Sequence, residues 1–461
     1  MTDATASTES LYAKQKRIHA REVDGVFDRL RVLCAATLLG AFYLIPWLQW
    51  GGRQAVLFDL PARRFHVFGM TLWPQDFIYL AWLLIMAALL LFMTTAVAGR
   101  LWCGYACPQT VWTEIFVAIE RLFEGPYNRR IKLEKKPWTA EKVARKFGKR
   151  SVWLILAAWT GLTFVGYFTP VRDLTVRLFA LELGTWETFW ICFYGLATFG
   201  NAGQLREQVC MYMCPYARFQ SAMFDENTLI VSYDAARGEQ RGSRKRGEDP
   251  RTKGLGDCID CNICVQACPT GIDIRDGLQY ECIACASCVD ACDSVMDRMG
   301  YPRGLVKYTT QRALEGKPSN ILRPRTIVYG TILGALSVGF VISILNRPML
   351  RVDVIRDRNA MFRESVDGLI ENVYTLKVLN KDAAAHTLEV TVEGLPGAVV
   401  QTDPEVLEMA PESLRSVAAR VLVPPDEAGV GGREIRFVVQ DSVEQELTAA
   451  RKSRFFAPVD R

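Results

Sequence analysis

Five apolar stretches restrict the fold of this 461-residue chain more than any other feature of its sequence. Each is close to the roughly 20 residues that an α-helix needs to cross the core of a bilayer. Lipid offers no hydrogen-bond partner to backbone groups, so such segments must be helical. The sequence therefore predicts a five-helix transmembrane bundle, with polar domains between and after its helices. The predicted helices cover residues 32–50, 77–98, 152–168, 186–203 and 326–345.

Lys and Arg are distributed unevenly among the loops that connect these stretches. Residues 100–150 contain 12 of them and residues 205–325 contain 17. The other two connections hold only Arg53, Arg63 and Arg64 in one and Arg172 and Arg177 in the other. Positive charge is retained in the cytoplasm, so the N-terminus and both basic loops are predicted to lie inside and the C-terminal segment outside.

Eight of the 14 cysteines form two copies of the pattern C-x2-C-x2-C-x3-C. Runs of this kind bind paired [4Fe–4S] clusters, and the fourth cysteine of each run ligates the cluster of the other run. The sequence thus predicts one cluster on the first three cysteines of run one and the last of run two. The first ligand set is Cys258, Cys261, Cys264 and Cys292, and the second is Cys282, Cys285, Cys288 and Cys268.

Zinc and disulfides are the alternatives for these cysteines. Two zinc sites would not need the doubled spacing or the proline that follows Cys268, and disulfides are disfavoured in the cytoplasm. The second run departs from the pattern, because Asp293 follows it where proline is expected. Paired clusters in one small domain carry single electrons, so the chain is predicted to transfer electrons at the inner face of a membrane.

A second repeat, C-x3-C-P, follows the second and the fourth apolar stretch. Proline is favoured at the first position of a helix, so each motif should be an interfacial turn into a helix that begins at Pro108 or Pro215. Thiols beside a helix N-terminus are expected to be more acidic than usual. If the two hairpins pack together, four sulfurs converge on a site for Cu(I) or for redox-active thiols. These candidate catalytic residues are Cys103, Cys107, Cys210 and Cys214.

Two other interpretations of the C-x3-C-P cysteines stay open. The four could hold a third iron–sulfur cluster, or they could be buried as small apolar residues, as is assumed for Cys34 and Cys192. Haem is disfavoured, because none of the three histidines falls in an apolar stretch. No nucleotide-binding or nucleic-acid-binding motif is found, and the basic segment 129–150 is expected to face anionic lipid.

The last 115 residues alternate polar and apolar positions, as in "VYTLKVLN" and "HTLEVTVEGL". Alternation of period two between Pro/Gly-rich turns is typical of an antiparallel sandwich. We therefore expect an all-β immunoglobulin-like domain that acts as a docking module. The predicted order is a cytoplasmic tail (1–30), a four-helix membrane region (31–210), a bacterial-type 2[4Fe–4S] ferredoxin domain (211–325), a fifth helix (326–346) and the sandwich (347–461).

This order of parts resembles the cytochrome c oxidase accessory protein family, the CcoG/FixG/RdxA-type membrane-bound polyferredoxins. The resemblance implies a multi-pass protein of the bacterial inner membrane with a periplasmic immunoglobulin-like domain. It also implies a role in maturing cbb3-type cytochrome c oxidase, with reduction of Cu(II) to Cu(I) as the chemistry. Cys103, Cys107, Cys210 and Cys214 would then bind copper or relay electrons to it. Implied partners are a cytoplasmic electron donor and a copper chaperone or oxidase assembly components.

Two other functions fit the same motifs. One is a quinol or ferredoxin electron relay that resembles the NapH/NosR proteins, which share the C-x3-C-P and double-cluster patterns. The other is a non-enzymatic assembly factor or redox sensor, in which the clusters report and the sandwich binds.

Overall fold

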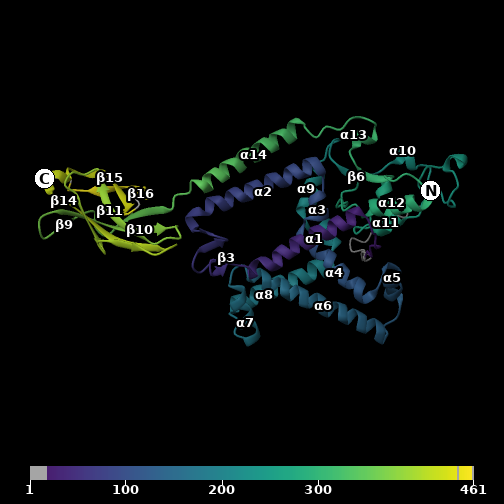
Figure 1. Ribbon diagram of the computed structural model, residues 1–461, viewed down its shortest axis with the longest axis horizontal. Coiled ribbons are helices and arrows are strands. Elements are labelled where there is room, and N and C mark those ends of the chain that lie inside the picture. Colours follow the sequence, from purple (N-terminus) through teal and green to yellow (C-terminus); the bar gives the residue numbers. More distant parts are fainter. Residues whose placement is uncertain (1–17, 444–445, 459–461) are drawn as a thin grey trace, which may run out of the picture. The chain divides into compact units, whose positions relative to one another are not determined.

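The computed structural model describes residues 18–443 and 446–458. The chain forms two compact units, unit 1 up to Val338 and unit 2 from Gly339. Unit 1 is mainly helical and carries every cysteine, whereas unit 2 consists mostly of strands (Figure 1). The membrane region and the ferredoxin region, predicted as separate domains, lie together in unit 1.

Three helices among the described residues are long and apolar enough to cross a membrane. The first is α1 (Val26–Leu44) with the short helix η1 (Ile45–Trp47). The second is η2 (Pro74–Asp76) followed by α2 (Phe77–Ala98), and the third is α14 (Pro324–Leu345). They match the predicted stretches 32–50, 77–98 and 326–345.

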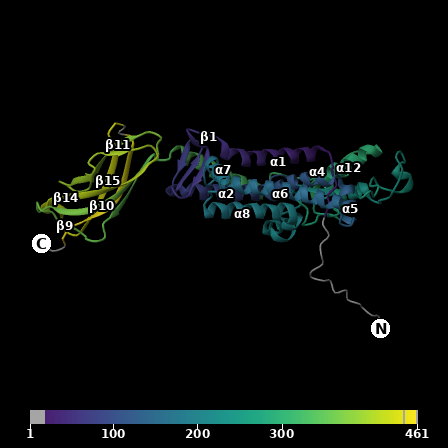
Figure 2. The same ribbon diagram turned by 90° about the horizontal axis from the view of Figure 1, so that it is seen from below.

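The other two apolar stretches are helical but shorter or mixed in character. Residues 152–165 form the second half of α6 (Ala140–Val165), whose first half is basic. Residues 186–203 lie in α8 (Thr185–Thr198) and in η3 (Phe199–Leu205), a π-helix that follows it directly. Neither helix meets the criteria for a membrane span by itself, so the predicted five-helix bundle is not confirmed. The two helices lie side by side (Figure 2).

The connections of unit 1 contain structure that the sequence did not predict. Residues 49–72 form two small antiparallel sheets, and α7 (Val171–Ala180) follows α6. The strands are β1 (Gln49–Trp50), β2 (Arg53–Gln54), β3 (Val56–Asp59), β4 (Arg64–Val67) and β5 (Met70–Leu72). After α2, the chain forms α3 (Leu101–Tyr105), α4 (Pro108–Glu124) and α5 (Tyr127–Lys135).

The basic segment that follows α4 is only partly directed outward. Glu120 of α4 is fully buried, and Arg130, Lys149 and Arg206 surround its carboxylate. Lys149 also pairs with the buried Glu124 at 2.5 Å. A buried carboxylate needs positive charge beside it, so these basic residues neutralise the interior of unit 1 and are not available to a lipid surface. The expectation that the whole segment faces lipid is therefore wrong for Arg130 and Lys149.

The ferredoxin region is built on one strand pair and two helices. Strand β6 (Ile230–Tyr233) pairs antiparallel with β7 (Val306–Thr309), and α11 (Ile263–Ala267) and α12 (Ser287–Met299) pack together. Short elements connect them. They are η4 (Val209–Met213), α9 (Pro215–Ala222), α10 (Ala235–Gly238), η5 (Pro250–Lys253), η6 (Ile274–Asp276) and α13 (Gln311–Leu314).

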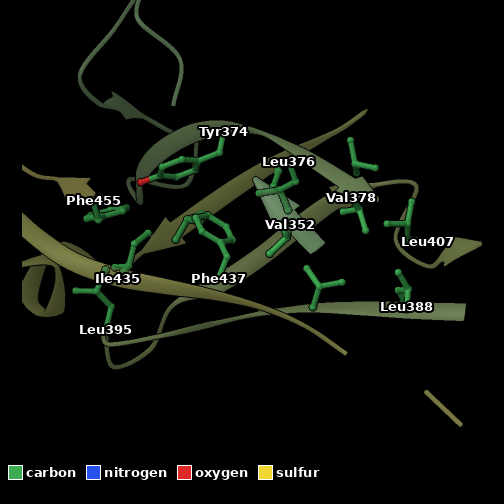
Figure 3. Close-up of a cluster of buried hydrophobic side chains, with 14 of the residues drawn as sticks. Val352, Tyr374, Leu376, Val378, Leu388, Leu395, Leu407, Ile435, Phe437 and Phe455 are labelled. Atoms are coloured by element: carbon green, nitrogen blue, oxygen red, sulfur yellow. The ribbon is translucent and has the colours of Figure 1, made fainter. Parts of the chain in front are cut away.

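Unit 2 is a sandwich of two antiparallel sheets. One sheet has the strand order β12-β14-β10-β8 with β9 beside β10, and the other has the order β13-β11-β15-β16. Tyr374 and Phe437 meet edge to face in its core, with ring centroids 4.9 Å apart (Figure 3). The strands of the first sheet are β8 (Leu350–Arg356), β9 (Arg363–Glu364), β10 (Ile370–Asn380), β12 (Val399–Asp403) and β14 (Leu414–Val423). Those of the second are β11 (His386–Glu393), β13 (Leu407–Met409), β15 (Gly432–Asp441) and β16 (Thr448–Phe456), and the one-turn helix α15 (Pro425–Ala428) precedes β15. The predicted all-β sandwich is confirmed.

Candidate metal centre and thiol site

The eight cysteines of the ferredoxin region surround two neighbouring cavities. The first has a volume of about 370 Å³, and the cysteines that line it are Cys258, Cys261, Cys264 and Cys292. The second has a volume of about 340 Å³ and is lined by Cys268, Cys282, Cys285 and Cys288. Cys264 also borders the second cavity, so the two lie next to each other. These groups are the same two sets that the crossed ligation pattern predicts.

The two cysteine loops repeat one backbone arrangement. In the first loop Asp260 and Asn262, on either side of Cys261, have positive φ. In the second loop Ala284 and Ala286, on either side of Cys285, do the same. Left-handed residues of this kind turn successive N–H groups toward a common concavity that suits an anion. The sequence contains no glycine at these four positions, so this repeat could not be read from composition.

The donor sets fit iron–sulfur clusters. Burial raises the pKa of the Cys282 and Cys292 thiols to about 12 and that of Cys264 to about 11. Thiols this weakly acidic keep their protons at neutral pH, and a bound metal has to displace them. Apolar side chains such as Val289, Met296 and Val306 form the surrounding core. Four soft donors in an apolar shell are what such clusters require.

The two C-x3-C-P motifs turn directly into helices, as predicted. Cys107 caps α4, which begins at Pro108, and Cys214 caps α9, which begins at Pro215. The partner cysteines are Cys103 in α3 and Cys210 in η4. Cys103 interacts electrostatically with both cysteines of the other motif, Cys210 and Cys214. Cys210 in turn interacts with Cys107. The two motifs therefore meet, and we call their four thiols the thiol site.

The expected acidity of the thiol site is wrong for three of its members. Burial, reinforced by the neighbouring thiols, raises the pKa of Cys103 and Cys210 to about 12. The pKa of Cys107 is also raised by burial, although the N–H groups of the first turn of α4 oppose the shift. Desolvation thus outweighs the helix N-terminus on which the expectation rested.

The thiol site lies directly against the loop of the second cysteine set. A Cβ atom on Gly104, inside the first motif, would lie 2.9 Å from the carbonyl oxygens of Ile283 and Ala284. It would also lie 3.0 Å from the Cα atom of Cys285. Only a residue without a side chain permits this approach. Gly104 therefore brings the first C-x3-C-P turn into backbone contact with the second set.

Three side chains from other segments reinforce this junction. Arg100 donates to the carbonyl oxygens of Tyr280 and Cys282, the latter at 3.2 Å, and to that of Ala217 in α9. Arg31 of α1 donates to the carbonyl oxygen of Cys285 at 2.7 Å, and the Tyr308 hydroxyl donates to that of Ala284 at 2.5 Å. Arg100, Gly104, Arg31 and Tyr308 were not predicted as site residues from the sequence. The sequence signal that could have identified Arg100 is the arginine shortly before each C-x3-C-P motif, Arg100 or Arg206. The structure shows that both are buried.

No three His, Cys, Asp or Glu side chains in the described part of the chain gather closely enough to hold a single metal ion. The two cysteine sets surround cavities instead of meeting at a point, and the thiol site likewise offers no assembled mononuclear centre. Of the remaining cysteines, Cys34 is half-buried in α1 and Cys192 is exposed on α8.

Comparison with protein families assigns three parts of the chain. Residues 205–311 match the model of a 4Fe-4S dicluster domain, which includes all eight cysteines of the ferredoxin region and the second C-x3-C-P motif. Residues 79–126 match that of a 4Fe-4S binding domain, and residues 340–458 match that of the IG-like fold at the C-terminus of FixG.

Whole-chain relatives agree with these assignments. The nitrogen fixation protein FixG of Rhizobium meliloti is 39% identical over 85% of this chain and 82% of its own length. Protein RdxA of Cereibacter sphaeroides is 42% identical over 85% of both chains. A crystal structure of a FixG-related protein from Vibrio parahaemolyticus is 28% identical and covers 23% of this chain and 95% of its own, with a TM-score of 0.22. With two cysteine-lined cavities and candidate membrane helices in one unit, the chain belongs to the FixG/RdxA family of iron–sulfur electron-transfer proteins.

Proposed function

We propose that this protein delivers electrons from its ferredoxin region to the thiol site and there reduces Cu(II) to Cu(I) for the maturation of a cbb3-type cytochrome c oxidase. Each copper ion takes up one electron, which a cytoplasmic donor supplies. Thiolates are soft ligands and favour the reduced ion, so the product is retained until a copper chaperone removes it.

The residues of the ferredoxin region would hold two [4Fe–4S] clusters, which supply one-electron chemistry when bound. Cys258, Cys261, Cys264 and Cys292 would ligate one of them, and Cys268, Cys282, Cys285 and Cys288 the other. Hydroxyl groups lie close to one sulfur of each run, Thr270 at 3.3 Å from Cys268 and Ser287 at 3.4 Å from Cys285. Hydrogen bonds to cluster sulfurs tune the potential, so these two hydroxyls would adjust the second set.

The observation that carries the proposal is the contact of Gly104 with residues 283–285. The first C-x3-C-P turn and the loop of the second cysteine set touch through their backbones, which supports short-range electron transfer between them. A surface pocket also lies between the two sites, because Cys210 of the thiol site and Cys285 of the second set both border it.

The membrane topology is part of the same proposal. We propose five crossings, with α6 and the continuous helix 185–205 as the third and fourth, the N-terminus and cysteine sets in the cytoplasm, and unit 2 in the periplasm. Gly161 of α6 faces the backbone of Ile191, where a Cβ would lie 2.3 Å from the carbonyl oxygen, and Gly195 of α8 faces Ala157. Small residues at a close helix contact are typical of helix pairs in membranes, and the loop charges favour this orientation.

The test is to replace Cys103, Cys107, Cys210 and Cys214 by serine together and to measure Cu(I) formation with a Cu(I)-specific chelator. We expect loss of most of the cupric reduction with unchanged iron and sulfide content. The matched control replaces Cys34 and Cys192, which lie outside both cysteine sets and the thiol site, and should reduce copper as the unchanged protein does. Undiminished reduction by the fourfold variant, with its iron retained, would refute the role of the thiol site.

A second candidate for the thiol site is a third iron–sulfur cluster. One specific observation favours it: residues 79–126, which contain Cys103 and Cys107, match a 4Fe-4S binding domain. The two candidates differ in metal content, because two clusters carry about 8 iron atoms per chain and three carry about 12. Iron analysis of anaerobically purified protein, before and after the fourfold serine change, separates them.

A further inference from the structure

We propose that Arg100 is the shared counter-charge of the thiol site and the second cysteine set, and that it makes this set the point from which electrons leave the ferredoxin region. The inference rests on the proposed electron transfer to the thiol site. It adds the order of the two cysteine sets and the residue that fixes this order.

Arg100 connects three segments that lie far apart in the sequence. It follows α2, precedes α3 and is 3% exposed. Its guanidinium donates to Tyr280 and Cys282 in the loop of the second set and to Ala217 in α9, the helix that Cys214 caps. One side chain thus holds the second cysteine loop and the second C-x3-C-P hairpin against the first, which makes Arg100 a positioning residue.

The charge of Arg100 is not neutralised by a carboxylate. Its neighbouring ionisable groups are, in order of strength, Cys103, Cys282, Cys210 and Cys214. Within the described residues no Asp or Glu lies within salt-bridge distance of it, and its Nε has no hydrogen-bond partner. A buried charge without a carboxylate partner is costly, so the thiolates that would ligate metal on both sides of Arg100 are its natural counter-ions. The carboxylate that faces the thiol site is Glu207, beside Cys210.

Three other arginines near these sites pair with carboxylates, and a fourth, Arg244 at the carbonyl of Cys258 (3.5 Å), is partly exposed, so that solvent screens its charge. Arg275, beside the first cysteine set, pairs with Asp260 at 2.6 Å and with Asp273 at 2.5 Å. Arg31, at the carbonyl of Cys285, pairs with Asp28 at 2.6 Å. Arg206, which precedes the second motif as Arg100 precedes the first, pairs with the buried Glu120.

An uncompensated positive charge favours the more negative, reduced form of whatever redox group lies beside it. Arg100, which is buried, therefore raises the reduction potential at the second cysteine set relative to the first, where Arg275 is neutralised and the charge of Arg244 is screened by solvent. Electrons then pass spontaneously from the first set to the second, and from there to the adjacent thiol site. The first set, whose loop residues Asp260, Cys261 and Asn262 are exposed, is left to meet the electron donor.

The experiment is a potentiometric EPR titration of the full-length protein, without copper, comparing Arg100→Gln with Arg206→Gln. The signal of the second set is identified by its change in Cys282→Ser. We expect Arg100→Gln to lower the potential of the second set, to leave that of the first set in place, and to slow cupric reduction about tenfold when copper is added. Arg206→Gln should shift the second potential much less.

Arg100→Lys keeps the positive charge but not the planar set of donors, so the reduction potential of the second set should stay close to that of the unchanged protein. This variant tests the inference if Arg100→Gln loses iron. Equal potentials of the two sets in the unchanged protein, or an unshifted second potential in an iron-replete Arg100→Gln, would overturn the inference. Because the potentials are measured without copper, they stay informative even if the thiol site proves to act on another acceptor.

Discussion

Unit 1 and unit 2 obtain their internal order in opposite ways. Around its cysteines unit 1 has cavities, left-handed backbone and buried charges, and its loops are held by side chains that reach backbone carbonyls. Unit 2 has no cysteine, and its two sheets enclose a core of fully buried residues such as Tyr374, Leu376, Phe437 and Phe455. We infer that the order of unit 1 depends on what it binds, whereas that of unit 2 depends mainly on apolar packing.

Iron removal should give the largest difference between the units. Each cysteine set without metal leaves four thiols around an empty cavity, so metal binding is part of the folding free energy of the region. After chelation under reducing conditions we expect residues 255–295 to become open to proteolysis and hydrogen exchange. The thermal transition of unit 2, followed in the same sample, should not move. Protection of residues 255–295 in iron-free protein would contradict the dependence proposed for unit 1.

Truncation of the core of unit 2 should have the reverse selectivity. Phe437 is fully buried and packs against Tyr374, whose hydroxyl donates to the carbonyl of Arg454 at 2.8 Å. Phe437→Ala should lower the free energy of unfolding of unit 2 by about 3–5 kcal/mol, because it leaves a cavity. Denaturant unfolding measures the loss, and iron content should be unchanged. Val430→Ala, at a side chain that is 67% exposed, is the matched control and should cost little.

A methyl group at the junction within unit 1 should have a smaller effect on stability and a clear one on function. Gly104→Ala places a Cβ atom against two backbone carbonyls that cannot turn away, so the turn must shift. We expect a cost of about 1–3 kcal/mol and slower cupric reduction at full iron content. Gly40→Ala is the control, since a Cβ there meets no atom within 4 Å. Equal rates for both variants would show that the backbone contact does not limit electron transfer.

Much of the fold of both units and of the site could be predicted from the sequence, although the signal differs between the units. Alternation predicted β10, β11, β14 and β15, because each has one face in the core of the sandwich. The doubled cysteine spacing predicted the two sets that the cavities bring together, and proline predicted where α4 and α9 begin. These signals are all local.

What the sequence could not predict depends on contacts over long distances. Arg100 acts on Tyr280 and Ala217, more than 100 residues away, and Gly104 matters only because residues 283–285 lie against it. The prediction that the thiols are acidic was wrong, because burial, which no motif encodes, raises their pKa more than the helix N-terminus lowers it. The membrane spans predicted at 152–168 and 186–203 were not confirmed. The first belongs to a helix with a basic first half, and the second is divided between a short α-helix and a π-helix.

The smallest predicted effect concerns the pH dependence of unit 2. Burial disfavours the charged form of His386, but hydrogen bonds with Asp382 and Asp441 outweigh it and raise the pKa of the imidazole. A group whose pKa is raised on folding stabilises the fold fully below its unfolded pKa of about 6.5 and loses that contribution as pH rises through the folded pKa. The melting temperature of the excised segment 347–461 should therefore fall as the pH rises from about 6.5 through the folded pKa of His386. His386→Gln should remove most of this slope, while Phe437→Ala should lower the whole curve and leave its slope in place. A slope that is identical with and without His386 would assign the pH dependence to other groups of the sandwich.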